Sequence, residues 1–233
     1  MVAMLPPDIL KDILVKHQKF LKGMKGGRRG DLRKSNLKKE QLQEMDLRQI
    51  QLEGANLSHA NLRGADLRGA DLFVVNMDHA DLTDANLEGC DLRGANLNNA
   101  ILRNTNLSGC DMRPGELMTG GYEKIRPTDL QNADLQDSDL SGADITGGLL
   151  GGATLSGANL SAVSLIGADF TDAPSMESPI SEVLLLGGAR RSAGENPHLP
   201  TFCVDPEGNF FEGDIVPGGA PVCVTFELIL VAD

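Results

Sequence analysis

An apolar residue recurs at every fifth position over most of the chain. The series begins at Leu32 and reaches Leu117 without a polar residue, eighteen positions in all, and it resumes at Leu130 for nine more, ending at Phe170. A helix repeats its apolar residues about every 3.6 positions and a strand every 2, so neither regular element explains a period of five. A fixed period of this kind predicts a solenoid, in which the chain turns a corner in each repeat and stacks its coils.

A second, smaller residue precedes each leucine by two positions. It is alanine in most of the repeats, and Cys90, Thr105 and Cys110 take its place in others. Large and small side chains that alternate in this way can fill a narrow core without voids. We therefore expect two inward positions in each repeat, while the other three positions are polar and face water.

The repeated unit reads Ala-(Asn/Asp)-Leu-X-X, as in Ala55-Asn56-Leu57 and Ala65-Asp66-Leu67. In this unit the chain resembles the pentapeptide-repeat family, over about 140 of its 233 residues. The resemblance implies an all-β fold, a right-handed quadrilateral β-helix in which four pentapeptides form one square coil. Coils of such a solenoid stack at about 4.8 Å, the ordinary spacing of strands. The family uses this rod in many ways, so the resemblance does not imply one function.

The residues that flank the repeats predict two further elements. Residues 1–29 contain Pro6-Pro7-Asp8, a typical helix start, followed by apolar residues with helical spacing and by lysines on the other face. We expect a helical cap on the first coil of the β-helix, which spans residues 30–173. The alternative is a basic amphipathic helix that lies on an anionic membrane.

Residues 174–233 predict a linker and a C-terminal β element. A hairpin is indicated on either side of the turn Asp205-Pro206-Glu207-Gly208, and a final strand over 222–231. This element is predicted to be a hairpin-like cap on the last coil or an interface for a homodimer. Cys203 and Cys223 could lie opposite each other across these strands, but in a reducing cytoplasm we expect both to be thiols.

The formal net charge of −12 is unevenly distributed. Residues 1–50 carry twelve Lys/Arg and six Asp/Glu, a balance of +6, and residues 51–233 carry nine and twenty-seven, a balance of −18. An acidic rod would repel DNA or imitate it, so direct nucleic-acid binding is not expected. The sequence shows neither an apolar run long enough to span a bilayer nor a secretory signal, which predicts a cytoplasmic protein.

Residues twenty positions apart should stack on the same side of the rod. One such column is a ladder of side-chain amides, Asn36, Asn56, Asn76 and Asn96, whose predicted role is structural. His59 and His79 form another stacked pair. Two histidines at this spacing could share a metal ion, but nothing in the sequence supplies a third ligand, so the favoured interpretation is a solvated surface. No metal and no cofactor is predicted.

The chain departs from its repeat at two places, and these are the candidate partner-binding residues. Phe73 and Val74 are apolar where the repeat is polar. A loop at about residues 113–128 interrupts the series by eight inserted residues between Leu117 and Leu130. It carries the other candidates, Arg113, Tyr122, Lys124 and Arg126, and loops on a regular scaffold often determine specificity.

No catalytic motif accompanies the repeat, and the four histidines have no nucleophile at a telling spacing. The sequence therefore predicts a non-enzymatic scaffold that binds a protein partner through the loop and a flat face. The alternative is an acidic DNA mimic that binds a DNA-handling enzyme such as gyrase, since some pentapeptide-repeat proteins act in that way.

Overall fold

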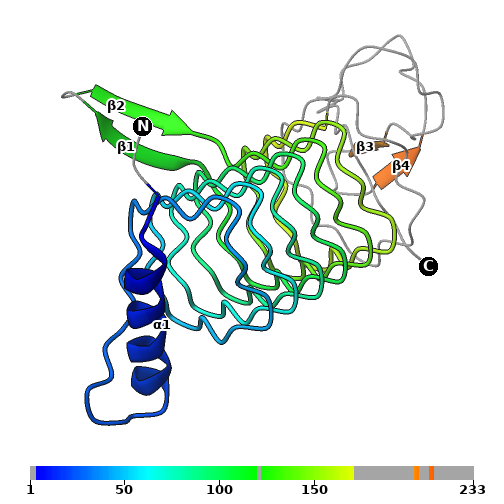
Figure 1. Ribbon diagram of the computed structural model, residues 1–233. Coiled ribbons are helices and arrows are strands. Elements are labelled where there is room, and N and C mark those ends of the chain that lie inside the picture. Colours follow the sequence, from blue (N-terminus) through cyan, green and yellow to red (C-terminus); the bar gives the residue numbers. More distant parts are fainter. Residues whose placement is uncertain (1–3, 120–121, 171–201, 205–209, 213–233) are drawn as a thin grey trace.

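The computed structural model describes residues 4–119, 122–170, 202–204 and 210–212, and most of them form a rod of stacked coils (Figure 1). Parallel bridges join residues twenty positions apart from Asp31 onward, for example Asn56 with Asn76 and Asp91 with Asp111. Twenty residues hold four repeats, so each coil has four sides and each repeat supplies one. The repeat β-helix expected from the sequence is confirmed.

The core is one leucine wide along each side of the rod. Leu57, Leu87 and Met77 are fully buried, and the small residues that precede them, such as Ala55, are buried as well. Burying one leucine contributes about 2 kcal/mol relative to leaving it in water. A small residue in most repeats lets large and small side chains alternate across the narrow coil, although Ile50 and Val163 are also buried at this position.

Each corner depends on the residue that lies two positions after the leucine. That residue adopts a left-handed backbone, with φ of +57° at His59, +61° at Gly64 and +56° at Asn99. The Asn or Asp before the leucine supports the turn, because its side-chain oxygen accepts a bond from the N–H two residues later, as Asn56 Oδ1 does from Ser58 N at 3.1 Å. The recurrent Asn/Asp of the repeat therefore has a structural origin.

The predicted amide ladder is present. The Nδ2 group of each asparagine donates to Oδ1 of the asparagine one coil earlier, at 3.4 Å from Asn56 to Asn36, 3.2 Å from Asn76 to Asn56 and 3.0 Å from Asn96 to Asn76. These bonds join four consecutive coils along one side of the rod.

Helix α1, Pro7–Leu21, packs against the first coil, with proline in its first turn. Leu10 and His17 are buried in this contact, whereas two residues of the predicted apolar face, Ile9 and Phe20, stay exposed. Gln18 Nε2 donates to Asp46 O at 2.6 Å. His17 Nδ1 accepts from Gly30 N at 3.1 Å, and burial lowers the pKa of His17.

Among the described residues, no helix is both long and apolar enough to cross a membrane.

The loop of the middle region is a β-hairpin, formed by β1, Gly115–Thr119, and β2, Tyr122–Arg126. The prediction that Leu117 continues the inward series is wrong, because Leu117 belongs to β1 and the last inward residue before the hairpin is Met112. The reason is Pro114, which falls where the coil needs a left-handed φ and an N–H donor; proline offers neither. The insertion is therefore longer than the eight residues predicted.

The predicted C-terminal hairpin is present as β3, Phe202–Val204, and β4, Phe210–Glu212, which pair in antiparallel register. The predicted linker and the predicted strand over 222–231, with Cys223, lie outside the described residues. A cap or a dimer interface in this part of the chain stays a prediction.

Candidate interaction site at the hairpin

Hairpin β1–β2 leaves the rod at a point where two backbones nearly touch. A Cβ atom on Gly94 would lie 3.1 Å from the backbone of Gly115 and from Arg126 O, so any larger residue would press on the base of the hairpin. Gly94 also has a φ of +64°, which glycine adopts without strain. Thr128 secures the other end of the hairpin, because its buried Oγ1 accepts a bond from Gly94 N at 3.0 Å.

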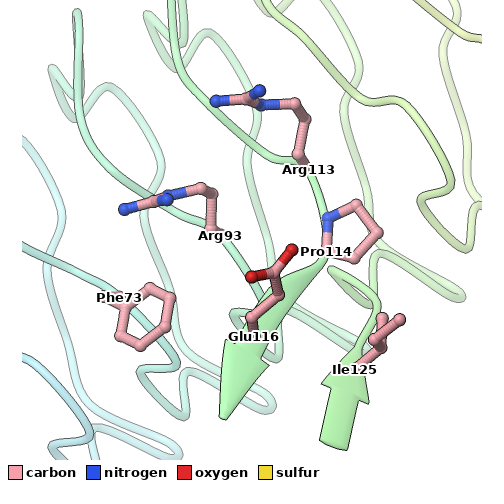
Figure 2. A pocket seen from close by; sticks show the side chains of 6 residues that line it. All are labelled: Phe73, Arg93, Arg113, Pro114, Glu116 and Ile125. Carbon is pink, nitrogen blue, oxygen red and sulfur yellow. The ribbon is translucent and has the colours of Figure 1, made fainter. Parts of the chain in front are cut away.

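The hairpin projects from the rod (Figure 1), and an open hollow of about 510 Å³ lies between its base and one side of the rod (Figure 2). Its wall on the rod is a single column, in which Phe73, Arg93 and Arg113 stand one coil apart. The residues that line this hairpin hollow are Phe73, Arg93, Arg113, Pro114, Glu116 and Ile125.

Phe73 is half-buried and lies against the base of the hairpin. A Cβ on Gly115 would lie 3.2 Å from the Phe73 ring, and the Arg93 guanidinium carbon lies 5.3 Å from the ring centroid. That distance is within the range of a cation–π contact. Val74 is half-buried at a corner with φ of +48°, which is unusual for a β-branched residue, and it does not line the hollow.

Both arginines of the hollow are held by aspartates of their own repeats. Arg93 Nε and Nη2 donate to the Asp91 carboxylate at 2.9 and 2.7 Å, and Arg113 makes the same fork with Asp111 at the same distances. The hydrogen bond from Arg113 is the main cause that lowers the pKa of Asp111. The forks fix the guanidinium planes along the wall and offset most of their charge, so the hollow is polar without being strongly basic.

The hairpin itself has two different faces. Glu116 and Ile125 are cross-strand partners, and both line the hollow. Ile125 is 64% exposed, the most exposed large apolar residue among the described ones. Lys124 is also exposed, and because side chains alternate along a strand it lies on the opposite face of the ribbon from Ile125.

The structure thus divides the predicted candidates between separate places. Phe73 and Arg113 meet at the hairpin hollow, whereas Lys124 lies on the ribbon's other face. Arg126 ends β2 where it crosses Gly94, and Tyr122 begins β2, where its backbone pairs with Thr119. Whether any of them binds a partner stays a prediction.

Four residues of the hollow were missed by the sequence reasoning, and some of them left a signal. Arg93 could have been found, because it stands twenty residues from both Phe73 and Arg113. Pro114 could also have been found, since it violates the corner position of the repeat. Glu116 and Ile125 carry no such signal, because their positions depend on the pairing inside the hairpin.

The repeats match a known family model, described as pentapeptide repeats, over residues 35–72, 76–113, 128–147 and 138–173. These ranges cover more than half of the chain. The chain belongs to the pentapeptide repeat family. This assignment agrees with the four-sided coils and with the Asn/Asp-Leu signature that builds them.

Several solved structures are similar to this pentapeptide repeat protein. HetL of Nostoc sp. strain PCC 7120, a pentapeptide repeat protein involved in heterocyst differentiation regulation, is 27% identical, with 73% of this chain and 80% of that chain covered and a TM-score of 0.49. A protein of the Arabidopsis thaliana thylakoid lumen is 25% identical, with coverage of 63% and 72% and a TM-score of 0.26. QnrB1, a plasmid-mediated fluoroquinolone resistance protein, is 19% identical, with coverage of 70% and 90% and a TM-score of 0.30. No curated protein matches the sequence significantly.

Proposed function

We propose that this protein is a non-enzymatic scaffold that binds a protein partner through hairpin β1–β2 and the hairpin hollow. The observation that carries the proposal is Ile125, a largely exposed apolar side chain on a projecting ribbon, at the rim of a hollow. An isolated exposed apolar residue is common, but this one lines the same hollow as an aromatic ring and two ordered guanidinium groups. Aromatic and arginine side chains are enriched among the residues that dominate binding energy.

The ribbon also offers backbone groups to a partner. Within the described residues, β1 and β2 pair only with each other, so each has an edge that no third strand covers. An extended peptide can add to such an edge through main-chain hydrogen bonds, and side-chain pockets beside it then supply specificity. The partner that fits is a protein with an extended segment whose apolar side chain enters the hollow.

The rod contributes rigidity to this site. The base of the hairpin is fixed by Gly94 and Thr128, and the wall of the hollow is fixed by the coil stack. A site on a rigid element loses little conformational entropy when it binds, so more of the contact energy contributes to affinity. This is the sense in which we call the protein a scaffold.

The test is to remove the hairpin without disturbing the coils. Gly115 and Arg126 are directly paired across the two strands, so residues 116–125 can be replaced by Asn-Gly, the sequence preferred for a two-residue hairpin turn. Wild-type and trimmed proteins are used as baits in native lysate, and the captured partner is then titrated by calorimetry. We expect the melting temperature to change by no more than a few degrees, because closing a loop depends only weakly on its length. Partner binding should be lost.

Point variants locate the contact more finely. Ile125→Ser should weaken the partner's binding, whereas Lys124→Ala, on the other face of the ribbon, should not. Ile101→Ser is the matched control, because Ile101 is an exposed isoleucine on a side of the rod away from the hollow. A partner that binds the trimmed protein as tightly as the wild type would contradict the proposal.

The second candidate function is the DNA mimic, and one observation favours it. The coils after the hairpin, residues 128–170, contain six aspartates and no lysine or arginine. Such a surface has the sign of charge that a DNA-handling enzyme such as gyrase attracts. A gyrase supercoiling assay with increasing amounts of the protein separates the two candidates. The scaffold proposal predicts neither inhibition nor protection of gyrase. The DNA-mimic proposal predicts one of these two effects, and predicts that it persists when the hairpin is removed.

A further inference from the structure

Two histidines lie one above the other on the rod. Their side of the rod comes directly after the side with the hairpin hollow in the order of the chain. His59 and His79 hold the same corner position in consecutive coils, with φ of +57° at both. Their rings are stacked, with centroids 4.9 Å apart and an angle of 26° between the planes. The stacking is imposed by the coil register, since His59 N donates to Asp78 O at 2.9 Å and His79 N donates to Asn98 O at 3.0 Å.

Asp78 adds a carboxylate to this pair. Its Oδ1 lies 2.8 Å from His79 Nδ1, and one donor atom from each of the three side chains lies within 4.8 Å of the other two. Both imidazoles are exposed and Asp78 is half-buried, so the group opens to solvent. Within the described part of the chain, this is the one group of three or more His, Cys, Asp or Glu side chains close enough to share an ion.

We propose that His59, Asp78 and His79 form a binding site for one divalent transition-metal ion of the zinc type. Imidazole nitrogen and carboxylate oxygen are the donors that zinc takes together, with bonds of about 2.0–2.2 Å. Donors around a tetrahedral ion at that distance lie about 3.4 Å apart, so the three side chains need only a small rotation to close on the ion. The exposed imidazoles are free to make it.

The donor set also determines which ions are excluded. Mg²⁺ and Ca²⁺ prefer all-oxygen surroundings, so two imidazoles disfavour them. Three protein donors leave at least one coordination position, which faces solvent and is filled by water. This is a surface site with an open position, distinct in chemistry from the hairpin hollow and independent of the scaffold proposal.

The repeat supplies variants that remove the donors without disturbing the fold. Asn99 holds the corner position one coil after His79 and has the same left-handed backbone, with φ of +56°, so His59→Asn and His79→Asn place a residue that the coil already accepts. Asn98 stands one coil after Asp78, which makes Asp78→Asn equally conservative. The double variant His59→Asn/His79→Asn keeps His17 and His198, and so reports any binding elsewhere.

The experiment is calorimetric titration of tag-free protein with Zn²⁺, repeated in excess Mg²⁺. We expect one equivalent to bind with a micromolar dissociation constant that Mg²⁺ does not change. Each single histidine variant should weaken binding by at least about tenfold, and Asp78→Asn should weaken it less than either, in proteins whose metal-free circular dichroism and melting temperature match the wild type. Absence of saturable binding in the wild type, or unchanged binding in the double variant, would overturn the proposal.

Discussion

The coils before the hairpin and the coils after it share one interior and differ in their surfaces. Leu87 and Leu140 stand in the same column on either side of the insertion, and both are fully buried. Their backbone N–H groups donate to the following coil in the same way, to Asn106 O at 2.7 Å and to Asn159 O at 2.9 Å. The difference lies in the residue directly after the leucine, which is arginine in many of the earlier repeats and Ser, Thr, Gly, Gln or Ile in the later ones.

The comparison shows which positions build the coil and which are free to vary. The buried pair and the corner residue are constrained in both runs. The residue after the leucine is not, and in the first run it makes Asp–Arg forks, as Arg68 does with Asp66 at 2.9 and 2.7 Å. We infer that the forks contribute surface chemistry and little stability, since exposed ion pairs are individually weak.

The largest effect should come from the shared interior. Leu87→Ala and Leu140→Ala should each lower the free energy of unfolding by about 2–5 kcal/mol, and by similar amounts, because each leaves a cavity in the same column. Denaturant unfolding followed by circular dichroism measures both. A much smaller loss for Leu140→Ala would show that the two runs are not packed alike.

A smaller effect is expected at the junction between the runs. Gly94→Ala and Gly89→Ala both put a Cβ on a left-handed residue, with φ of +64° and +65°, which costs about 1–2 kcal/mol. Only at Gly94 would that Cβ also press on Gly115 and Arg126, whereas nothing lies within 4 Å of it at Gly89. Gly94→Ala should therefore be the more destabilising by about 1 kcal/mol or more in thermal melts. Equal melting temperatures would mean that the hairpin base shifts freely.

The smallest effect distinguishes the two surfaces. The bond from Arg68 lowers the pKa of Asp66 below its ordinary 3.8, so the charged carboxylate is favoured by folding. That stabilisation is present above pH 3.8 and is lost as the pH falls through the lowered value in the folded state. Asp66→Asn should lower the melting temperature slightly at neutral pH and low salt, and the loss should vanish in acid.

Asp139→Asn is the matched variant in the second run. Asp139 supports its corner by accepting from Ser141 N at 2.9 Å, a role that asparagine can keep, and among the described side chains it makes no salt bridge. Its substitution should lower the melting temperature less than Asp66→Asn does at neutral pH and low salt, because no arginine fork is lost. A salt- and pH-dependent loss equal to that of Asp66→Asn would contradict the distinction between the surfaces.

Much of the fold could be predicted because two features of the sequence, the inward leucines and the corner residues, recur with the same five-residue period. Columns such as the asparagine ladder followed from counting by twenty. The hairpin's exact extent did not follow, because Leu117 happens to fall on the five-residue series although Pro114 had already ended the coil.

The candidate sites were less accessible to sequence reasoning than the coils. The pairing that brings Ile125 to the hollow has no period to reveal it. The repeat does not distinguish Asp78 from the other outward polar residues, because its approach to His79 depends on rotamers and not on register.

The way the chain rejoins the rod after the hairpin determines which insertions and deletions the fold tolerates. Before the insertion, bridged residues are twenty positions apart, and across it Asn96 pairs with Asp129, thirty-three positions later, with every column resumed in its old place. Because Gly115 and Arg126 lie side by side, a segment added or deleted between them alters neither the height of the stack nor the order of its faces. Insertions of other lengths at this corner are therefore tolerated by the architecture, whereas one extra residue within a coil would turn every later leucine outward. Evolution, or an engineer, can thus exchange the projecting segment in one step and keep the rod.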